Sequence, residues 1–266
     1  MELTRRVRLR GEQLDEIDNR ILIQSVEPQA GKDQRTTAQL WSGIGSRVTA
    51  EHRDWLEVKV TFSLDMKRDA YAERAEVLEK IITWASTVGW LQISQKPGRR
   101  LRVILDQLPA EGDALNWTAR YTLVFRAYGI PYWQDTSADG ITINGTSGAK
   151  GMEVRGNART AVDFEFKNTS TGTINTFDIT AGESRIALQN LGLLSGETLL
   201  FDHNDNGRRC VVRIRIRSIA GNYRSVLECR TPQSSDDLYV EPGQVNVIMN
   251  AQRKGTLTAE ARGRWL

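Results

Sequence analysis

Residues 121–133 read YTLVFRAYGIPYW, an alternating run that stops abruptly at a proline followed by two aromatic residues. Leu123, Phe125 and Ala127 share one face of an extended chain, because successive side chains of a strand point to opposite faces. Pro131 has no N–H for a sheet ladder and favours an extended residue before it, so we expect the strand to end here. The run therefore marks a domain boundary at the midpoint of a chain of 266 residues.

The composition is that of an ordinary globular protein, with 39% hydrophobic and 26% charged residues. The length suits two domains of about 100–150 residues, each with a core of its own. A net charge of +3, from 36 basic and 33 acidic residues, is too small to demand nucleic acid or an anionic membrane as a partner. No apolar run approaches the ~20 residues of a membrane-spanning helix, and no secretory signal is visible. We expect neither nucleic acid nor a membrane as a partner.

Residue types that carry catalysis or bind metals are scarce. The chain has two histidines, His52 and His203, and two cysteines, Cys210 and Cys229. Without a secretory signal the cysteines are read as reduced thiols. No catalytic constellation and no nucleotide-binding fingerprint can be assembled from the sequence. We therefore expect a protein that is not an enzyme and has no cofactor and no metal centre.

One stretch allows two interpretations. Residues 202–207 read DHNDNG and match the opening of a calcium-binding loop, but the twelfth position of that loop would be Arg213, where a bidentate Glu is required. Asn-Gly between two strands is also a strong hairpin signal. The hairpin turn is the preferred interpretation, and a bound cation is the alternative.

A long helix is predicted over residues 68–88, or about 66–88 with its cap. Asp65 is the candidate N-cap, and Gly89 fits the residue just after the helix. Glu76 and Lys80 are four residues apart, in the favourable order for an ion pair. The expected buried stripe consists of Tyr71, Ala75, Leu78, Ile81, Ile82 and Ala85.

Most other segments are predicted to be strands. In the first half the candidates are 21–26, 55–62, 90–94, 100–105 and 116–127. In the second half they are 162–167, 174–179, 185–188, 198–201, 210–217, 224–229, 245–250 and 256–265. The expected fold is mainly β. Residues 1–133 would form an α+β domain, a β-sandwich or split barrel with one helix, and residues 134–266 an antiparallel β-sandwich.

Two features are candidates for contacts with other chains. The polar segment 28–47 is expected to be a long loop, and loops longer than about 12–15 residues are often functional. Trp41 within it is a candidate exposed aromatic, or it folds back onto its own core. Arg213, Arg215 and Arg217 fall on one face of the strand 210–217. This face is solvated by default, with a contact site for an acidic partner as the alternative.

The order of several short motifs resembles the distal tail proteins of long-tailed bacteriophages. The predicted helix contains a late Trp84, and it is followed by GWLQIS at 89–94, a Pro-Gly turn at 97–98 and PYW at 131–133. The second half is similar to the galectin-like domain of that family. The motifs that carry this similarity are GNART at 156–160, GETLLFD at 196–202 and PGQVN at 242–246.

The resemblance implies a structural virion protein at the tail tip, synthesised in the cytoplasm of the bacterial host. Such proteins assemble as hexameric rings that join the tail tube to the tail tip or baseplate, with the N-terminal domain forming the ring. The implied partners are five further copies of the chain, the tail tube protein, the tail hub or tip protein and the tape-measure protein. The candidate subunit-interface residues are Arg35, Leu40, Trp41, Arg213, Arg215 and Arg217.

The alternative function is that of a carbohydrate-binding β-sandwich protein used in host-surface attachment. Sugar sites usually combine an exposed aromatic ring with polar side chains. Trp265 lies in the terminal strand candidate, and Tyr223 and Tyr239 lie near predicted turns. These three aromatics are the residues on which this alternative depends.

Overall fold

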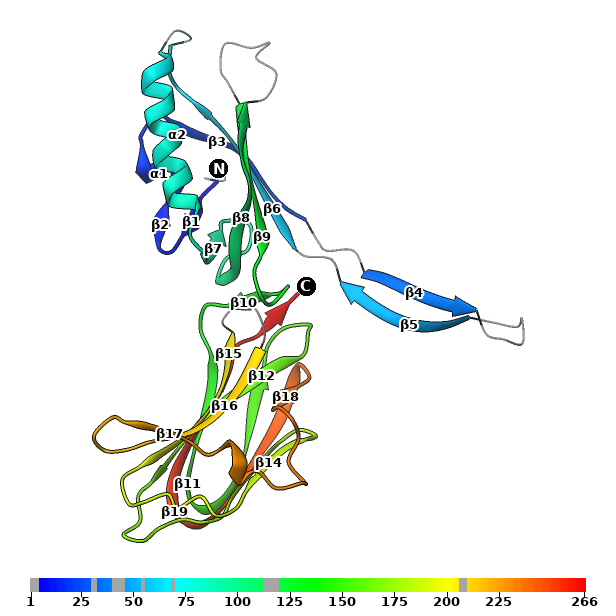
Figure 1. The fold of residues 1–266 in the computed structure, drawn as a ribbon, viewed down its shortest axis with the longest axis vertical. Helices are drawn as coiled ribbons and strands as arrows, with labels where there is room; N and C mark the ends of the chain where they lie inside the picture. Colours follow the sequence, from blue (N-terminus) through cyan, green and yellow to red (C-terminus); the bar gives the residue numbers. More distant parts are fainter. Residues whose placement is uncertain are drawn as a thin grey trace. The chain divides into compact units, whose positions relative to one another are not determined.

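The computed structural model describes residues 5–29, 33–39, 46–53, 56–67, 70–111, 120–205 and 210–266 (Figure 1). The chain divides into two compact units, Met1–Trp133 and Gln134–Leu266. Both units are built mainly from antiparallel strands, so the predicted mainly β fold is confirmed. None of the helices in the described ranges is both long and apolar enough to cross a membrane.

The main sheet of the first unit has the strand order β2-β1-β7-β8-β9-β6-β3. Its strands are β1 (Val7–Leu9), β2 (Glu12–Gln13), β3 (Ile21–Gln29), β6 (Glu57–Leu64), β7 (Gly89–Ile93), β8 (Arg99–Glu111) and β9 (Arg120–Ala127). The predicted alternation in residues 121–127 is confirmed, because Leu123 and Phe125 of β9 are fully buried and pair in register with Val60 and Val58 of β6. These central strands supply much of the core of this unit.

The long helix α2 (Tyr71–Ala85) forms as predicted, together with a single turn, α1 (Leu14–Ile17). The predicted buried stripe is wrong in part: α2 buries Val77 and Trp84 together with Ile81 and Ala85, whereas Tyr71 is 69% exposed. The Trp84 ring meets Phe125 of the sheet edge to face, with 6.1 Å between the ring centres. Both stripes obey helical spacing, and the helix takes the one that buries the large indole ring.

Both predicted ends of α2 are also wrong. The helix is preceded by Ala70 rather than capped by Asp65, whose backbone N–H donates to the Arg20 carbonyl at 2.8 Å. The helix ends at Ala85 and is capped by Ser86, and Gly89 is already the first residue of β7. Gly89 is needed for close approach, because a Cβ there would lie 2.6 Å from Cγ of Arg10.

The segment predicted as a long loop contains strands. β4 (Asp33–Gln39) and β5 (Ser46–Arg53) pair antiparallel in a two-stranded sheet of their own (Figure 1). We call residues 33–53 the arm. Its sequence lacks an alternating apolar face, because a two-stranded ribbon need not cover a core on either side. That missing period is why the strands escaped prediction.

In the second unit the strand order is β14-β13-β19-β12-β15-β16-β17, with β11 paired to β19 and β18 paired to β12. The strands are β11 (Asp139–Val154), β12 (Thr160–Asn168), β13 (Phe177–Ala181), β14 (Ser184–Leu188), β15 (Thr198–Asp205), β16 (Cys210–Arg217), β17 (Tyr223–Ser225), β18 (Tyr239–Val240) and β19 (Gly243–Ala261). Two short strands, β10 (Trp133–Asp135) and β20 (Arg264–Trp265), pair with each other. The predicted strand at 224–229 is instead β17 followed by a 3-10 turn, Leu227–Cys229.

The second unit closes around one core because β19 serves both halves of the sandwich. One half of β19 pairs with β13 and the other half with β12, while β11 follows it on its other edge. The two halves face each other through aromatic rings: Phe166 of β12 lies 4.6 Å from Phe177 of β13, measured between ring centres. The predicted antiparallel sandwich is thereby confirmed, although the two strands predicted at 245–250 and 256–265 form a single long strand up to Ala261.

Candidate interaction surfaces

The arm contains one of the predicted contact residues in its described part. Arg35 lies in β4, in register with Glu51 of β5, and Leu40 and Trp41 lie outside the described residues. β4 and β5 form a sheet of two strands only. Their outer backbone N–H and C=O groups therefore face away from this sheet's own ladder, and such edges can pair with another chain.

The three predicted arginines of β16 do share one face. Ile214 and Ile216, which alternate with these arginines along the strand, point into the core and are 2% and 0% exposed. The Arg215 guanidinium donates to Oδ2 of Asp202 at 2.7 Å, and Arg217 lies 3.6 Å from Oε2 of Glu165.

Neighbouring groups thus engage much of this arginine face from within the unit. Arg215 also lies 4.7 Å above the centre of the Tyr223 ring, and Arg213 has an interaction of its own. Ion pairs of this exposed kind stabilise a protein by about 0–1 kcal/mol each. The arrangement favours the solvated-face interpretation over a strongly attractive site for an acidic partner.

The 202–207 stretch is strand where it is described. β15 and β16 pair up to Asp205 opposite Cys210, as a hairpin requires, and residues 206–209 lie outside the described residues. Asp202 is engaged by Arg215, and the His203 ring contacts Oδ1 of Asp163 at 2.9 Å. Within the described ranges no group of three His, Cys, Asp or Glu side chains is placed to hold a metal ion.

Cys229 is a free thiol at the 3-10 turn of the second unit. Its Sγ lies 3.6 Å from the carbonyl oxygen of Asn190. Burial raises the pKa of the Cys229 thiol above its ordinary value, which disfavours the reactive thiolate. This residue therefore behaves as a structural cysteine.

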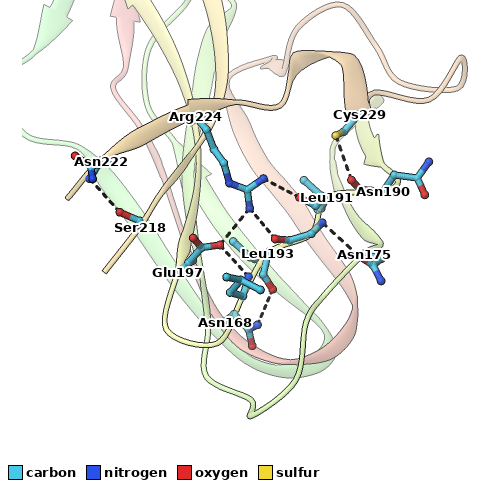
Figure 2. Close-up of polar contacts among 12 residues, drawn as sticks. Asn168, Asn175, Asn190, Leu191, Leu193, Glu197, Ser218, Asn222, Arg224 and Cys229 are labelled. Carbon is cyan, nitrogen blue, oxygen red and sulfur yellow. Dashed lines mark hydrogen bonds and ion pairs between the residues drawn. The ribbon is translucent and has the colours of Figure 1, made fainter. Parts of the chain in front are cut away.

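A buried polar network fixes the loop between β14 and β15 (Figure 2). Asn168 is fully buried, and its amide donates to the carbonyls of Gly172 at 2.9 Å and Leu193 at 3.0 Å. Glu197 accepts hydrogen bonds from the Leu194 N–H at 2.9 Å and from Arg224 at 3.2 Å. The polar side chains of the network are hydrogen-bonded to loop backbone groups and to each other, so the network has a structural role.

An open groove lies on the outer face of β13, β14 and β19. Its volume is about 450 Å³, which is within the usual range of small-molecule sites. Its polar lining includes Thr176, Asp178, Arg185, Gln233, Asn250 and Gln252. Sequence analysis missed the groove because these residues come from four separate segments and match no motif.

The three aromatic residues on which the carbohydrate alternative depends lie elsewhere. The Tyr239 ring packs against His203, and the Trp265 indole N–H donates to Oδ1 of Asp135 at 2.9 Å. Tyr223 is 55% exposed and carries Arg215 over its face. None of the three is among the described residues that line the groove.

The sequence matches no protein-family model and no curated protein. Among solved structures, it is similar to SPP1 Dit, which is described as a paradigm of the hub adsorption apparatus in phages that infect Gram-positive bacteria. The alignment covers 99% of this chain and 100% of that chain, with a TM-score of 0.72 and 16% identity. The chain has the SPP1 Dit fold.

The resemblance inferred from short motifs is thus confirmed at the level of the fold, across both units. Two structures of the phage p2 baseplate in its activated conformation, with Sr and with Ca, also align with this chain. Each alignment covers 96% of this chain and 98% of the other, with a TM-score of 0.46 and 8% identity.

Proposed function

We propose that this chain is a structural, non-enzymatic component of a bacteriophage tail, located in the virion at the distal end of the tail. The observation that carries the proposal is the alignment with SPP1 Dit over 99% of this chain and the whole of the other. An alignment of that extent includes both units and the order in which they follow each other. A shared sandwich alone would leave half of the chain unmatched.

In the finer form of the proposal, six copies form a ring that joins the tail tube to the tail tip or baseplate. The first unit builds the ring, and its partners are the tube protein, the hub or tip protein and the tape-measure protein. A closed ring needs heterologous contacts, in which one surface of a subunit meets a different surface of the next.

The first unit offers two surfaces suited to such contacts. The arm is a two-stranded sheet separate from the main sheet. The edge strand β3 pairs on one side with β6, and Leu22 on it is 50% exposed. Unpaired strand edges template pairing with another chain. We assign Arg35, Leu40 and Trp41 of the arm segment to the subunit contact. The arginine face of β16, in the second unit, is proposed only as a weak additional contact, because groups of the same unit already pair with Arg215 and Arg217.

Native mass spectrometry and light scattering on the full chain test the ring. The chain has a mass of 30.0 kDa, so a closed six-fold ring would have a mass of about 180 kDa. The measurement is made on the protein alone and again with the tail tube protein from the same phage. A monomer under every condition would contradict the proposed ring.

A further inference from the structure

The side of the main sheet that faces away from the core carries several arginines. Along β1, β7 and β8, buried apolar residues alternate with exposed or half-buried ones. Arg8 is the register partner of Gln92, and Trp90 is the register partner of Arg102, so these side chains share the outward side. Arg100 shares it too, because it precedes Arg102 by two residues on β8. We call Arg8, Arg100 and Arg102 the basic face.

Aromatic rings hold two of these guanidinium groups in place. Cζ of Arg100 lies 4.1 Å from the centre of the Trp90 ring, and Cζ of Arg102 lies 5.6 Å from the centre of the Tyr128 ring. The N–H of Tyr128 donates to the Arg102 carbonyl at 2.8 Å, which keeps Tyr128 beside the strand. A stacked arginine has fewer rotamers to lose, so the ordering cost of binding a partner is lower.

The carboxylates that reach this side of the sheet are engaged by a different arginine. Glu57 and Asp106 lie 3.2 Å and 3.1 Å from the guanidinium of Arg126. Within the ranges that the structure describes, no ion pair joins Arg8 or Arg102 to an acidic side chain. The arginine face of β16 differs, since carboxylates of its own unit pair with it. The basic face therefore keeps positive charge that a partner can use.

The opposite side of the first unit carries the opposite charge. α2 packs on the buried side of the sheet, where Trp84 meets Phe125, and α1 contacts α2 there (Figure 1). Together the two helices have five acidic and two basic residues. Asp15 and Glu79 are exposed, and neither side chain has a partner among the described residues. We call the exposed acidic residues of the two helices the acidic face: Asp15, Glu16, Glu73, Glu76 and Glu79.

Two faces of opposite charge on opposite sides of one subunit suit a ring. In a ring, one surface of each subunit meets a different surface of the next. A two-fold dimer built on the basic face would instead place like charges together, which is unfavourable. Exposed ion pairs add little affinity, but complementary charge sets the orientation of the partners and rejects wrong contacts. The charge distribution therefore favours head-to-tail contact between copies.

We propose that the basic face of one copy docks against the acidic face of the next copy in the ring. This inference rests on the proposed ring, and it adds a second pair of surfaces to the contact assigned to the arm. Nucleic acid is a less suitable occupant, because Arg100 lies over the Trp90 ring on which a base would stack. The net charge of the whole chain is also only +3.

Charge-reversal variants of the full chain test this contact by native mass spectrometry. The double variant Arg8→Glu, Arg102→Glu makes both faces acidic. The double variant Asp15→Lys, Glu79→Lys reverses the net charge of the helices. Each variant alone should associate at least about tenfold more weakly than the wild type, because like charges then meet. An equimolar mixture of the two variants should restore hexamers in which they alternate, because each supplies the charge that the other needs.

The matched control is Lys150→Glu, Lys254→Glu. Both lysines are exposed residues of the second unit, and the control changes the net charge by as much as the first variant does. It should assemble like the wild type. Arg102 is half-buried, so Arg8→Glu at its exposed position is also measured alone, and thermal unfolding checks the fold of every variant.

Folded variants that form hexamers as readily as the wild type would overturn this inference and leave the ring standing. A mixture of folded variants that stays dissociated would also overturn it. If Arg8→Glu abolished binding of single-stranded DNA and left assembly unchanged, the face would belong to nucleic acid and the inference would be wrong. A wild-type chain that stays monomeric with and without the tail tube protein would overturn the ring and this inference together.

Discussion

At the scale of single residues, Asn168 shows how one buried amide organises a loop region. Replacing Asn168 with Ala removes two hydrogen bonds to the carbonyls of Gly172 and Leu193 and two that Asn168 accepts from Ser170, and it leaves a hole in a buried site. We expect Asn168→Ala to lower the free energy of unfolding by roughly 2–4 kcal/mol. Hydrogen exchange of the β12 amides reports this unit separately from the other. The control Asn246→Ala should change it by less than about 0.5 kcal/mol, and equal effects would contradict this role.

The pKa of Asp18 predicts how the stability of the first unit changes at acid pH. Hydrogen bonds from Arg20 lower the pKa of Asp18 from 3.8 to about 2. The folded-state pKa lies below the unfolded one. The contact between Asp18 and Arg20 therefore stabilises the fold fully above pH 3.8, and this stabilisation is lost as the pH falls towards 2. Arg20 is partly solvated, so screening limits the effect to about 1 kcal/mol.

The variant Asp18→Asn cannot make this contribution at any pH. The first unit of the wild-type protein should therefore lose more stability in that acid window than the variant does. Urea unfolding at a series of pH values, followed in the β1 and β3 amides by hydrogen exchange, measures the difference. Parallel acid profiles for the two proteins would show that the contact is not stabilising.

At the scale of elements, α2 allows the buried face predicted from the sequence to be tested against the buried face that the structure shows. Trp84 is 4% exposed and Tyr71 is 69% exposed, although only Tyr71 belonged to the stripe predicted from sequence. Trp84→Ala should cost about 3–5 kcal/mol because it empties a large site against the sheet. Tyr71→Ala should stay within about 0.5 kcal/mol. Chemical denaturation of both variants measures the free energies of unfolding. A larger loss for Tyr71→Ala than for Trp84→Ala would favour the buried stripe predicted from the sequence.

Glycines in the long antiparallel strand pair of β11 and β19 have unequal importance. A Cβ on Gly255 would lie 2.2 Å from Cζ of Phe166, whereas a Cβ on Gly151 would have only the Gln244 amide oxygen nearby, at 3.6 Å. Gly255→Ala should therefore cost about 1–3 kcal/mol through overpacking. Gly151→Ala should be neutral or slightly stabilising. Thermal unfolding of the two variants tests this, and similar melting temperatures would argue against the close approach.

The strands of both units show where sequence reasoning succeeds and fails. Strands with one buried face, such as β9 and β16, were predicted because alternation is a direct consequence of burial on one side. β11 was missed because its glycines remove both the propensity and the pattern. The groove was missed because its lining residues come from separate segments that only the fold brings together.

At the scale of the whole molecule, the proposed ring assigns the arm a role that can be removed without touching the main sheet. Gln29 of β3 and Glu57 of β6 are register partners on either side of the arm. Replacing residues 30–55 with Asn-Gly would join the two strands through a short hairpin turn, with Leu56 retained. The residues of the main sheet all remain.

We expect this armless variant to fold and to lose the six-fold assembly, because one side of the heterologous contact is gone. Native mass spectrometry should then report a monomer where the full chain forms a hexamer, while far-UV circular dichroism keeps its β signature. Trp41→Ala within the intact arm should weaken assembly in the same direction, because aromatic residues are enriched among the residues that dominate binding energy. An armless chain that still forms hexamers would move the subunit contact to the sheet edge at β3, whose backbone groups the replacement leaves unchanged.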